Sequence, residues 1–160
     1  MVSYWELDKE ALAALRPEAF RIHRRIETRW RDNDMQGHVN NAVYYEYFDT
    51  AINSWLMQEL ARGDWPTGVL RFVAESGCKY IRQLAYPTPI LLAHNVARIG
   101  RSSVTYEVGI FPVEDGKAGP LCALGRWVHV LVDHTTHRPI VIPETIRAGL
   151  ETGLTEPTRH

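Results

Sequence analysis

A short run of polar residues, Asp34 to Asn41, contains the side chains best suited to chemistry. It reads Asp-Met-Gln-Gly-His-Val-Asn-Asn and joins a segment with strand-like alternation to a long apolar segment with helical periodicity. The first N–H groups of a helix are unpaired and carry a partial positive charge, so they can stabilise an oxygen that becomes negative. A carboxylate on the other side of the same carbonyl can activate water or attack directly. The run therefore predicts nucleophilic attack on a carbonyl group, for which no metal is needed.

Two carboxylates compete for this role, Asp32 and Asp34, and the residues alone leave both open. Either one can also be an ordinary turn or capping carboxylate. His38 can position a substrate, hydrogen-bond to Asp34 or pack within the loop. No second ligand lies at helical spacing from it, so the sequence predicts no metal site.

The segments on either side of the run predict how it is held. Residues 21–30 alternate as a half-exposed strand, with Ile22, Ile26, Thr28 and Trp30 on one side. Asn40 or Asn41 is expected to cap a helix that continues to about Ala61, because an Asn side chain accepts a hydrogen bond from a first-turn N–H. Apolar residues cover most sides of this helix and leave only a narrow polar edge. Such a helix must be enclosed, and we expect a sheet to enclose it.

Four extended segments follow, at residues 69–83, 89–100, 102–113 and 120–133, with hairpin-like connections. Pro143 is expected to begin a short terminal helix. One strand, one helix and then four strands indicate an α+β fold with the helix on one face of a five-stranded antiparallel sheet. An open sheet has two edges to protect, so we expect at least a dimer. The predicted division is an N-terminal appendage (1–20), one domain (21–150) and a flexible tail (151–160).

The composition excludes several other classes of protein. The chain has 160 residues, of which 45% are hydrophobic, which suits one domain with one core. Its 18 Lys and Arg and 19 Asp and Glu give a net charge of -1, whereas a protein that coats nucleic acid is more basic. No apolar run approaches the roughly 18 residues that span a bilayer, and the first residues do not read as a secretory leader. We expect a cytoplasmic protein with no membrane partner. Cys78 and Cys122 are too few for a disulfide framework.

The region around Asp34 resembles a known family. The run from Arg29 to Asp49 contains Asp-x-x-Gly-His-Val-Asn-Asn followed by a Tyr-rich helix, and the likeness continues through residues 80–84, 99–103 and 138–143. This pattern is similar to the signature of hotdog-fold acyl-CoA thioesterases related to 4-hydroxybenzoyl-CoA thioesterase. The likeness extends from about Arg21 to Arg147. It implies the hotdog fold, in which a five-stranded antiparallel sheet wraps one long central helix.

The resemblance also implies an activity and a set of site residues. The activity is hydrolysis of an acyl-CoA, or of an acyl-carrier-protein thioester, without a cofactor, in a groove between the subunits of a homodimer or tetramer. The match makes Asp34 the general base or nucleophile and the Asn41 N–H the group that polarises the carbonyl. Gly37 lets the backbone approach the thioester, and His38 completes the expected catalytic set. The expected substrate-binding residues are Asn40, Tyr44, Arg98, Arg101, Ser102 and Ser103. Each of these residues also has a purely structural interpretation. Tyr44 can simply pack in the core, and Arg98, Arg101, Ser102 and Ser103 can simply be solvated residues at a turn.

Two other functions fit the same fold. A hotdog hydratase or dehydratase uses an Asp-x-Asn-Pro-x-His loop, but here Asp34 is one residue too close to His38, Asp32 is one too far, and the proline is absent. A module that only binds an acyl thioester gains nothing from a carboxylate beside the carbonyl. Glu46 and Asp49 lie on the helix that carries the catalytic carboxylate in another subgroup, but we expect structural or dimer contacts from them.

Overall fold

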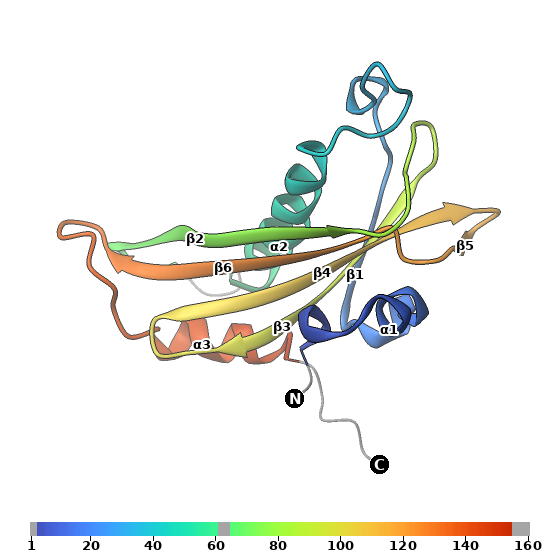
Figure 1. Cartoon of the computed structure of the whole chain (residues 1–160). Helices are drawn as coiled ribbons and strands as arrows, with labels where there is room; N and C mark the ends of the chain where they lie inside the picture. Colours follow the sequence, from blue (N-terminus) through green and yellow to red (C-terminus); the bar gives the residue numbers. More distant parts are fainter. Residues whose placement is uncertain (1–2, 61–64, 155–160) are drawn as a thin grey trace, which may run out of the picture.

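The structure, a computed structural model, describes residues 3–60 and 65–154, and its main feature is a sheet that holds a long helix (Figure 1). The antiparallel sheet has the spatial order β1 (Ile22–Ile26), β3 (Ile90–Ile99), β4 (Ser103–Glu114), β6 (Ala123–Asp133) and β2 (Val69–Tyr80). A sixth strand, β5 (Lys117–Ala118), pairs only with β4. The predicted α+β hotdog fold is confirmed. The additional strand arises because the turn after β4 continues into a two-residue hairpin.

Helix α2 (Val43–Leu60) lies against the inner face of the sheet. Its buried side chains point in several directions and are Tyr44, Tyr47, Phe48, Ala51, Ile52, Trp55 and Leu56. Phe48 lies directly on Gly125 of β6, where a Cβ atom would be only 2.7 Å from its ring. Burial of each large apolar side chain contributes roughly 1.5–3 kcal/mol, so this helix is a main source of the fold's stability. The sheet-enclosed helix is therefore confirmed.

Two details of the predicted sheet are wrong. The first strand ends at Ile26, and the chain turns into a short 3-10 helix, η3 (Trp30–Asp32), because the Asp32 carboxylate accepts the Arg29 N–H at 2.8 Å. Trp30, expected on the buried side, is 80% exposed. The expected hairpin after β2 is also absent, since β2 pairs with β6 and not with β3. The connection to β3 contains Pro87 and is too long for a tight turn.

The N-terminal residues pack on the outer face of the sheet, where Figure 1 shows α1 (Lys9–Ala14) opposite to α2. Leu12 and Phe20 form a second apolar cluster with side chains of the strands. The buried Glu107 carboxylate accepts hydrogen bonds from the N–H groups of Tyr4 and Trp5, both at 3.0 Å. The short helices η1 (Tyr4–Glu6) and η2 (Pro17–Ala19) complete this layer.

Helix α3 (Glu144–Glu151) follows Pro143 as predicted and buries Ile146 and Leu150 beside α2. The predicted flexible tail lies outside the described residues from residue 155 onward. None of the helices in the described ranges is both long and apolar enough to cross a bilayer.

The two edges of the sheet differ in character. Strand β1 has five residues and carries the exposed side chains of His23, Arg24 and Arg25. Strand β2 has twelve residues and exposes the apolar side chains of Leu70, Phe72, Val73 and Tyr80. A long apolar edge strand is prone to pair with another chain. Edge β2 is therefore the one suited to association.

Candidate active site

The loop before α2 is a tight turn that sets the position of Asp34. Asn33 and Val39 form an isolated antiparallel bridge, and the Asp34 N–H donates to the His38 carbonyl at 2.9 Å. The Gly37 N–H donates to the Asp34 carbonyl at 3.0 Å, and Gly37 adopts a φ of +79°. This left-handed conformation favours glycine. Gly37 is therefore required by the shape of the turn.

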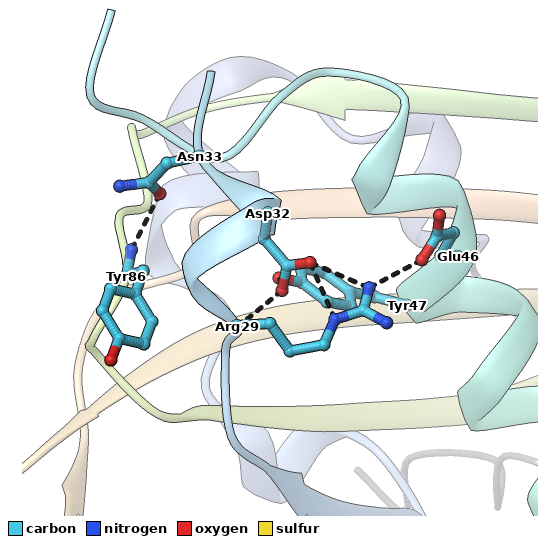
Figure 2. A network of polar contacts seen from close by, with 6 residues as sticks. All are labelled: Arg29, Asp32, Asn33, Glu46, Tyr47 and Tyr86. Carbon is cyan, nitrogen blue, oxygen red and sulfur yellow. Dashed lines mark hydrogen bonds and ion pairs between the residues drawn. The ribbon is translucent and has the colours of Figure 1, made fainter. Parts of the chain in front are cut away.

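Asp32 is buried in a network that fixes this loop to the helix (Figure 2). Its carboxylate accepts hydrogen bonds from the Arg29 N–H and the Arg29 Nε, both at 2.8 Å, and from the Tyr47 hydroxyl at 2.6 Å. Burial, together with the hydrogen bond to Asp32, raises the pKa of Tyr47. Arg29 also pairs with Glu46 at 2.7 Å. With only 1% of its surface exposed, Asp32 is placed to hold the structure together and not to meet a substrate.

Asp34 is exposed and lines a cavity of about 280 Å³. One of its carboxylate oxygens accepts the Gln36 N–H at 2.8 Å, which holds the side chain in the turn. The described residues that line the cavity are Asp34, Gln36, His38, Val39, Asn41, Tyr44, Tyr80, Ile81, Arg82 and Gln83, and Asp34 is the only carboxylate among them. The structure thus brings four of the predicted site residues, Asp34, His38, Asn41 and Tyr44, to one cavity.

The turn just before α2 contributes Asn41, and with it an unpaired backbone donor, to the lining of this cavity. The Asn40 Oδ1 accepts the N–H of Ala42, the residue before α2, at 2.9 Å, so the Asn40 side chain closes the turn that leads into the helix. The Asn41 carbonyl accepts the Tyr80 hydroxyl at 2.9 Å. Within residues 3–60 and 65–154 the Asn41 N–H has no hydrogen-bond partner. This N–H is therefore available to a ligand oxygen.

Two tyrosines, Tyr44 and Tyr80, line the cavity, and the thiols of Cys78 and Cys122 lie near Tyr44. The ring of Tyr44 packs edge-on against that of Tyr80 at 5.0 Å, and burial raises the pKa of Tyr44 to about 12. Burial likewise raises the pKa of Cys78 to about 12 and that of Cys122 to about 11. At neutral pH these groups stay protonated, so neither thiol competes with Asp34 as a nucleophile. The sequence indicated residues 80–84 only by resemblance, and no local pattern identified Tyr80 or Arg82 as cavity residues.

The other predicted binding residues lie at the opposite end of the sheet. Ser103 pairs with Val130, which in turn pairs with Phe72 near the start of β2, whereas the Asp34 cavity adjoins Tyr80 at its end. The carbonyls of Arg101 and Ser102 accept backbone N–H groups and so help to hold the turn. Arg98 lines a separate cavity of about 600 Å³ together with Arg126 and Arg147. Within one chain, Arg98, Arg101, Ser102 and Ser103 are not brought to Asp34.

A third cavity, of about 440 Å³, lies at the start of β2 and is lined by Leu56, Met57, Trp65, Val69, Leu70 and Arg71. The Asp34 cavity and this one therefore occupy opposite ends of the same edge strand. Among the described residues there is no cluster of three or more His, Cys, Asp or Glu side chains that suits a metal ion.

Comparison with known families identifies the family to which the chain belongs. The model of the thioesterase-like superfamily matches residues 28–150, which include the Asp34 loop, α2 and the sheet. The chain belongs to this superfamily. The predicted hotdog thioesterase family and the predicted class of thioester hydrolase are thereby confirmed.

Several solved structures are similar to the chain. The PA5185 protein from Pseudomonas aeruginosa strain PAO1 is 38% identical, with a TM-score of 0.78 over 88% of this chain and 96% of that one. A predicted thioesterase from Bacillus stearothermophilus is 25% identical, with a TM-score of 0.71 over 84% and 97%. The DHNA-CoA thioesterase from Staphylococcus aureus is 19% identical over 81% and 86%, has a TM-score of 0.67 and shares the fold. No curated protein sequence matches the chain.

Proposed function

We propose that the protein hydrolyses acyl-CoA thioesters to a free acid and CoA, with Asp34 as the catalytic carboxylate. The observation that carries this proposal is one cavity lined both by Asp34 and by Asn41, just before α2. Among the described residues Asp34 is the only carboxylate that lines it, and the Asn41 N–H has no hydrogen-bond partner. Sulfur stabilises a thioester carbonyl poorly, and a thiol with a pKa of about 8.5 leaves readily as thiolate. The site therefore needs an activated nucleophile and an oxyanion donor, and no strong acid.

Two routes use the same residues. In the first, the Asp34 carboxylate takes a proton from water, the oxygen of that water bonds to the carbonyl carbon, and the carbon–sulfur bond breaks. In the second, the carboxylate attacks the carbonyl itself, and water then hydrolyses the resulting anhydride. In both, the Asn41 N–H stabilises the negative oxygen, and the departing thiolate takes up a proton. His38, on the cavity wall, positions the substrate.

The proposed working unit is a dimer formed through β2. This strand is the long apolar edge of the sheet, and pairing with a second copy would cover Leu70, Phe72 and Val73. A two-fold axis makes the paired strands antiparallel, so that the start of one β2 lies beside the end of the other. The Asp34 cavity of one subunit is then next to the 440 Å³ cavity of its partner.

The same two-fold symmetry would bring the remaining predicted binding residues close to the active site of the partner subunit. The turn from Gly100 to Ser103 lies at the β2-start end of its own subunit, and the two-fold axis carries that end towards the partner's Asp34. Arg98 and Arg101 then approach the CoA phosphates of a substrate bound at the partner's carboxylate. We also propose that the protein acts in the cytoplasm, where acyl-CoA is available, and that residues 21–150 form the catalytic domain.

A thiol-release assay with short, long and aromatic acyl-CoAs tests the function. We expect release of CoA thiol from at least one of these classes, without an added metal ion. Acyl-carrier-protein thioesters tested in parallel decide between the two carriers. Binding of CoA esters with no thiol release would refute the proposal. A change in enoyl absorbance without thiol release would instead indicate a hydratase.

A further inference from the structure

The cavity at the start of β2 has the features of a receptor for the acyl group of a substrate. Its volume is about 440 Å³, and among the described residues that line it all but Arg71 are apolar. Met57, on its rim, is 72% exposed, and Leu70 is 36% exposed. An apolar cavity with one charged group both accepts a hydrocarbon chain and fixes the position of its far end.

Arg71 is held in place but keeps most of its hydrogen-bonding capacity. Its guanidinium lies 5.2 Å from the centre of the Trp65 ring and donates to the Asn53 Oδ1 at 2.5 Å. In the described part of the chain it makes no other hydrogen bond and no ion pair. A guanidinium has five N–H donors in a rigid fork, so most of them remain available. The contacts with Trp65 and Asn53 therefore orient the guanidinium but leave most of its N–H groups without a hydrogen-bond acceptor among the described residues.

The charge of Arg71 is also not balanced by the core around it. Burial lowers the pKa of Arg71, although the group stays charged at neutral pH. Next to the larger effect of burial, the Arg71 charge acts to lower the pKa of the buried Tyr106 and His129. The Tyr106 hydroxyl and the His129 Nδ1 both lack a hydrogen-bond partner among the described residues. Asp49 on α2 attracts it but forms no ion pair with it. An anion that binds in the cavity would supply the ion pair that this partly buried cation lacks among the described residues.

We propose that Arg71 selects acyl thioesters whose acyl group ends in a carboxylate, and that it serves the active site of the partner subunit. This inference rests on the proposed function, both for the thioester at Asp34 and for the dimer through β2. In that dimer the acyl group extends from Asp34 of one subunit into the cavity of the other. A terminal carboxylate accepts two parallel hydrogen bonds from the guanidinium. A terminal methyl group leaves those donors unpaired.

The test compares two acyl-CoAs of equal chain length, one ending in a methyl group and one in a carboxylate, at short, medium and long lengths. For at least one length, we expect the wild-type kcat/KM to be about 10- to 100-fold higher for the carboxylate, the effect of one or two charge-assisted hydrogen bonds. The Arg71→Met variant should lose this ratio, chiefly through KM, and Arg71→Lys should retain part of it. Arg24→Met, on the opposite edge strand, is the control and should keep the wild-type ratio.

Because the ratio is measured within one protein sample, it does not depend on how much of a variant folds. Two results would overturn the inference and leave the proposed function intact. One is an equal kcat/KM of the wild type for the methyl-ended and the carboxylate-ended substrate at every length. The other is an unchanged ratio of these two kcat/KM values in Arg71→Met. No thiol release from any substrate would instead refute the proposed function itself.

A mixed dimer tests whether the two groups act across subunits. A dimer of one Asp34→Asn chain and one Arg71→Met chain, isolated with two affinity tags, has one complete site if Asp34 and Arg71 come from different subunits. We expect it to show the wild-type preference for the carboxylate at about half of the wild-type rate, with one site of two complete. If the groups act within one chain, the only site with Asp34 lacks Arg71. Loss of the preference in the mixed dimer would then overturn the inference.

Discussion

Replacement of Asp32 by Asn separates the structural carboxylate from the proposed catalytic one. The wild-type carboxylate accepts two hydrogen bonds from Arg29 and one from Tyr47, and bonds to an ionised group contribute roughly 1.5–3 kcal/mol each. The Arg29 side chain is 43% exposed and can regain water, which reduces the loss. We expect the free energy of unfolding to fall by about 3 kcal/mol. For a chain of this size the melting temperature should fall by roughly 10 °C.

Urea unfolding of Asp32→Asn and Asp34→Asn provides the assay, with the second variant as the matched control. Asp34 is exposed and its carboxylate accepts only the Gln36 N–H, so its replacement should cost less than about 1 kcal/mol. Asp32→Asn that remains folded should keep most of its rate per folded molecule. Equal stability of the two variants would refute the structural role of Asp32. If Asp32→Asn instead abolished thiol release while remaining fully stable, the roles of the two carboxylates would have to be exchanged.

Two further predictions concern the core and the edge of the sheet. Burial lowers the pKa of His94 and His129 to about 3, so the unfolded chain binds more protons than the folded chain between about pH 6.5 and 3. The free energy of unfolding should therefore decrease as the pH falls through this range, by up to about 1.4 kcal/mol per unit for each histidine. His94→Leu should make this slope, measured by urea unfolding, smaller by that amount, and an unchanged slope would show that His94 does not titrate in this way. Val73→Glu places like charges close together where two β2 strands pair, so light scattering should detect monomers that no longer release thiol. A dimer of unchanged mass would exclude β2 as the interface.

The fold and the loop could be predicted because their signals are local. The apolar periodicity from Tyr44 to Trp55 indicated an enclosed helix, and the Asn40–Asn41 pair indicated that the helix begins close behind it. Gly37 likewise indicated the turn, because glycine is common where the chain turns. These features depend on residues only a few positions apart, where sequence spacing and spatial distance agree.

One failure is local and the others arise where distant residues decide the outcome. Trp30 fits the strand alternation, but the Asp32 carboxylate accepts the N–H of Arg29, three residues before it, and this local turn ends the extended segment. Asp32 and Asp34 are equivalent in the local sequence, and they differ because the Tyr47 hydroxyl, one helix turn into α2, reaches only Asp32. The position of β2 at the edge, beside β6, is set by pairing across the whole sheet. That pairing also placed Arg98 and Ser103 away from Asp34, which no local pattern indicated.

The most direct test of the account is thiol release by Asp34→Asn on the best substrate found for the wild-type protein. The Asn side chain keeps the shape of the turn but can neither take a proton from water nor attack a carbonyl. We predict an unchanged fold and oligomeric state, with turnover lower by a factor on the order of 100 to 10000, the effect of a positioned base. Near-normal turnover in this variant would contradict the assignment of Asp34 as the catalytic carboxylate.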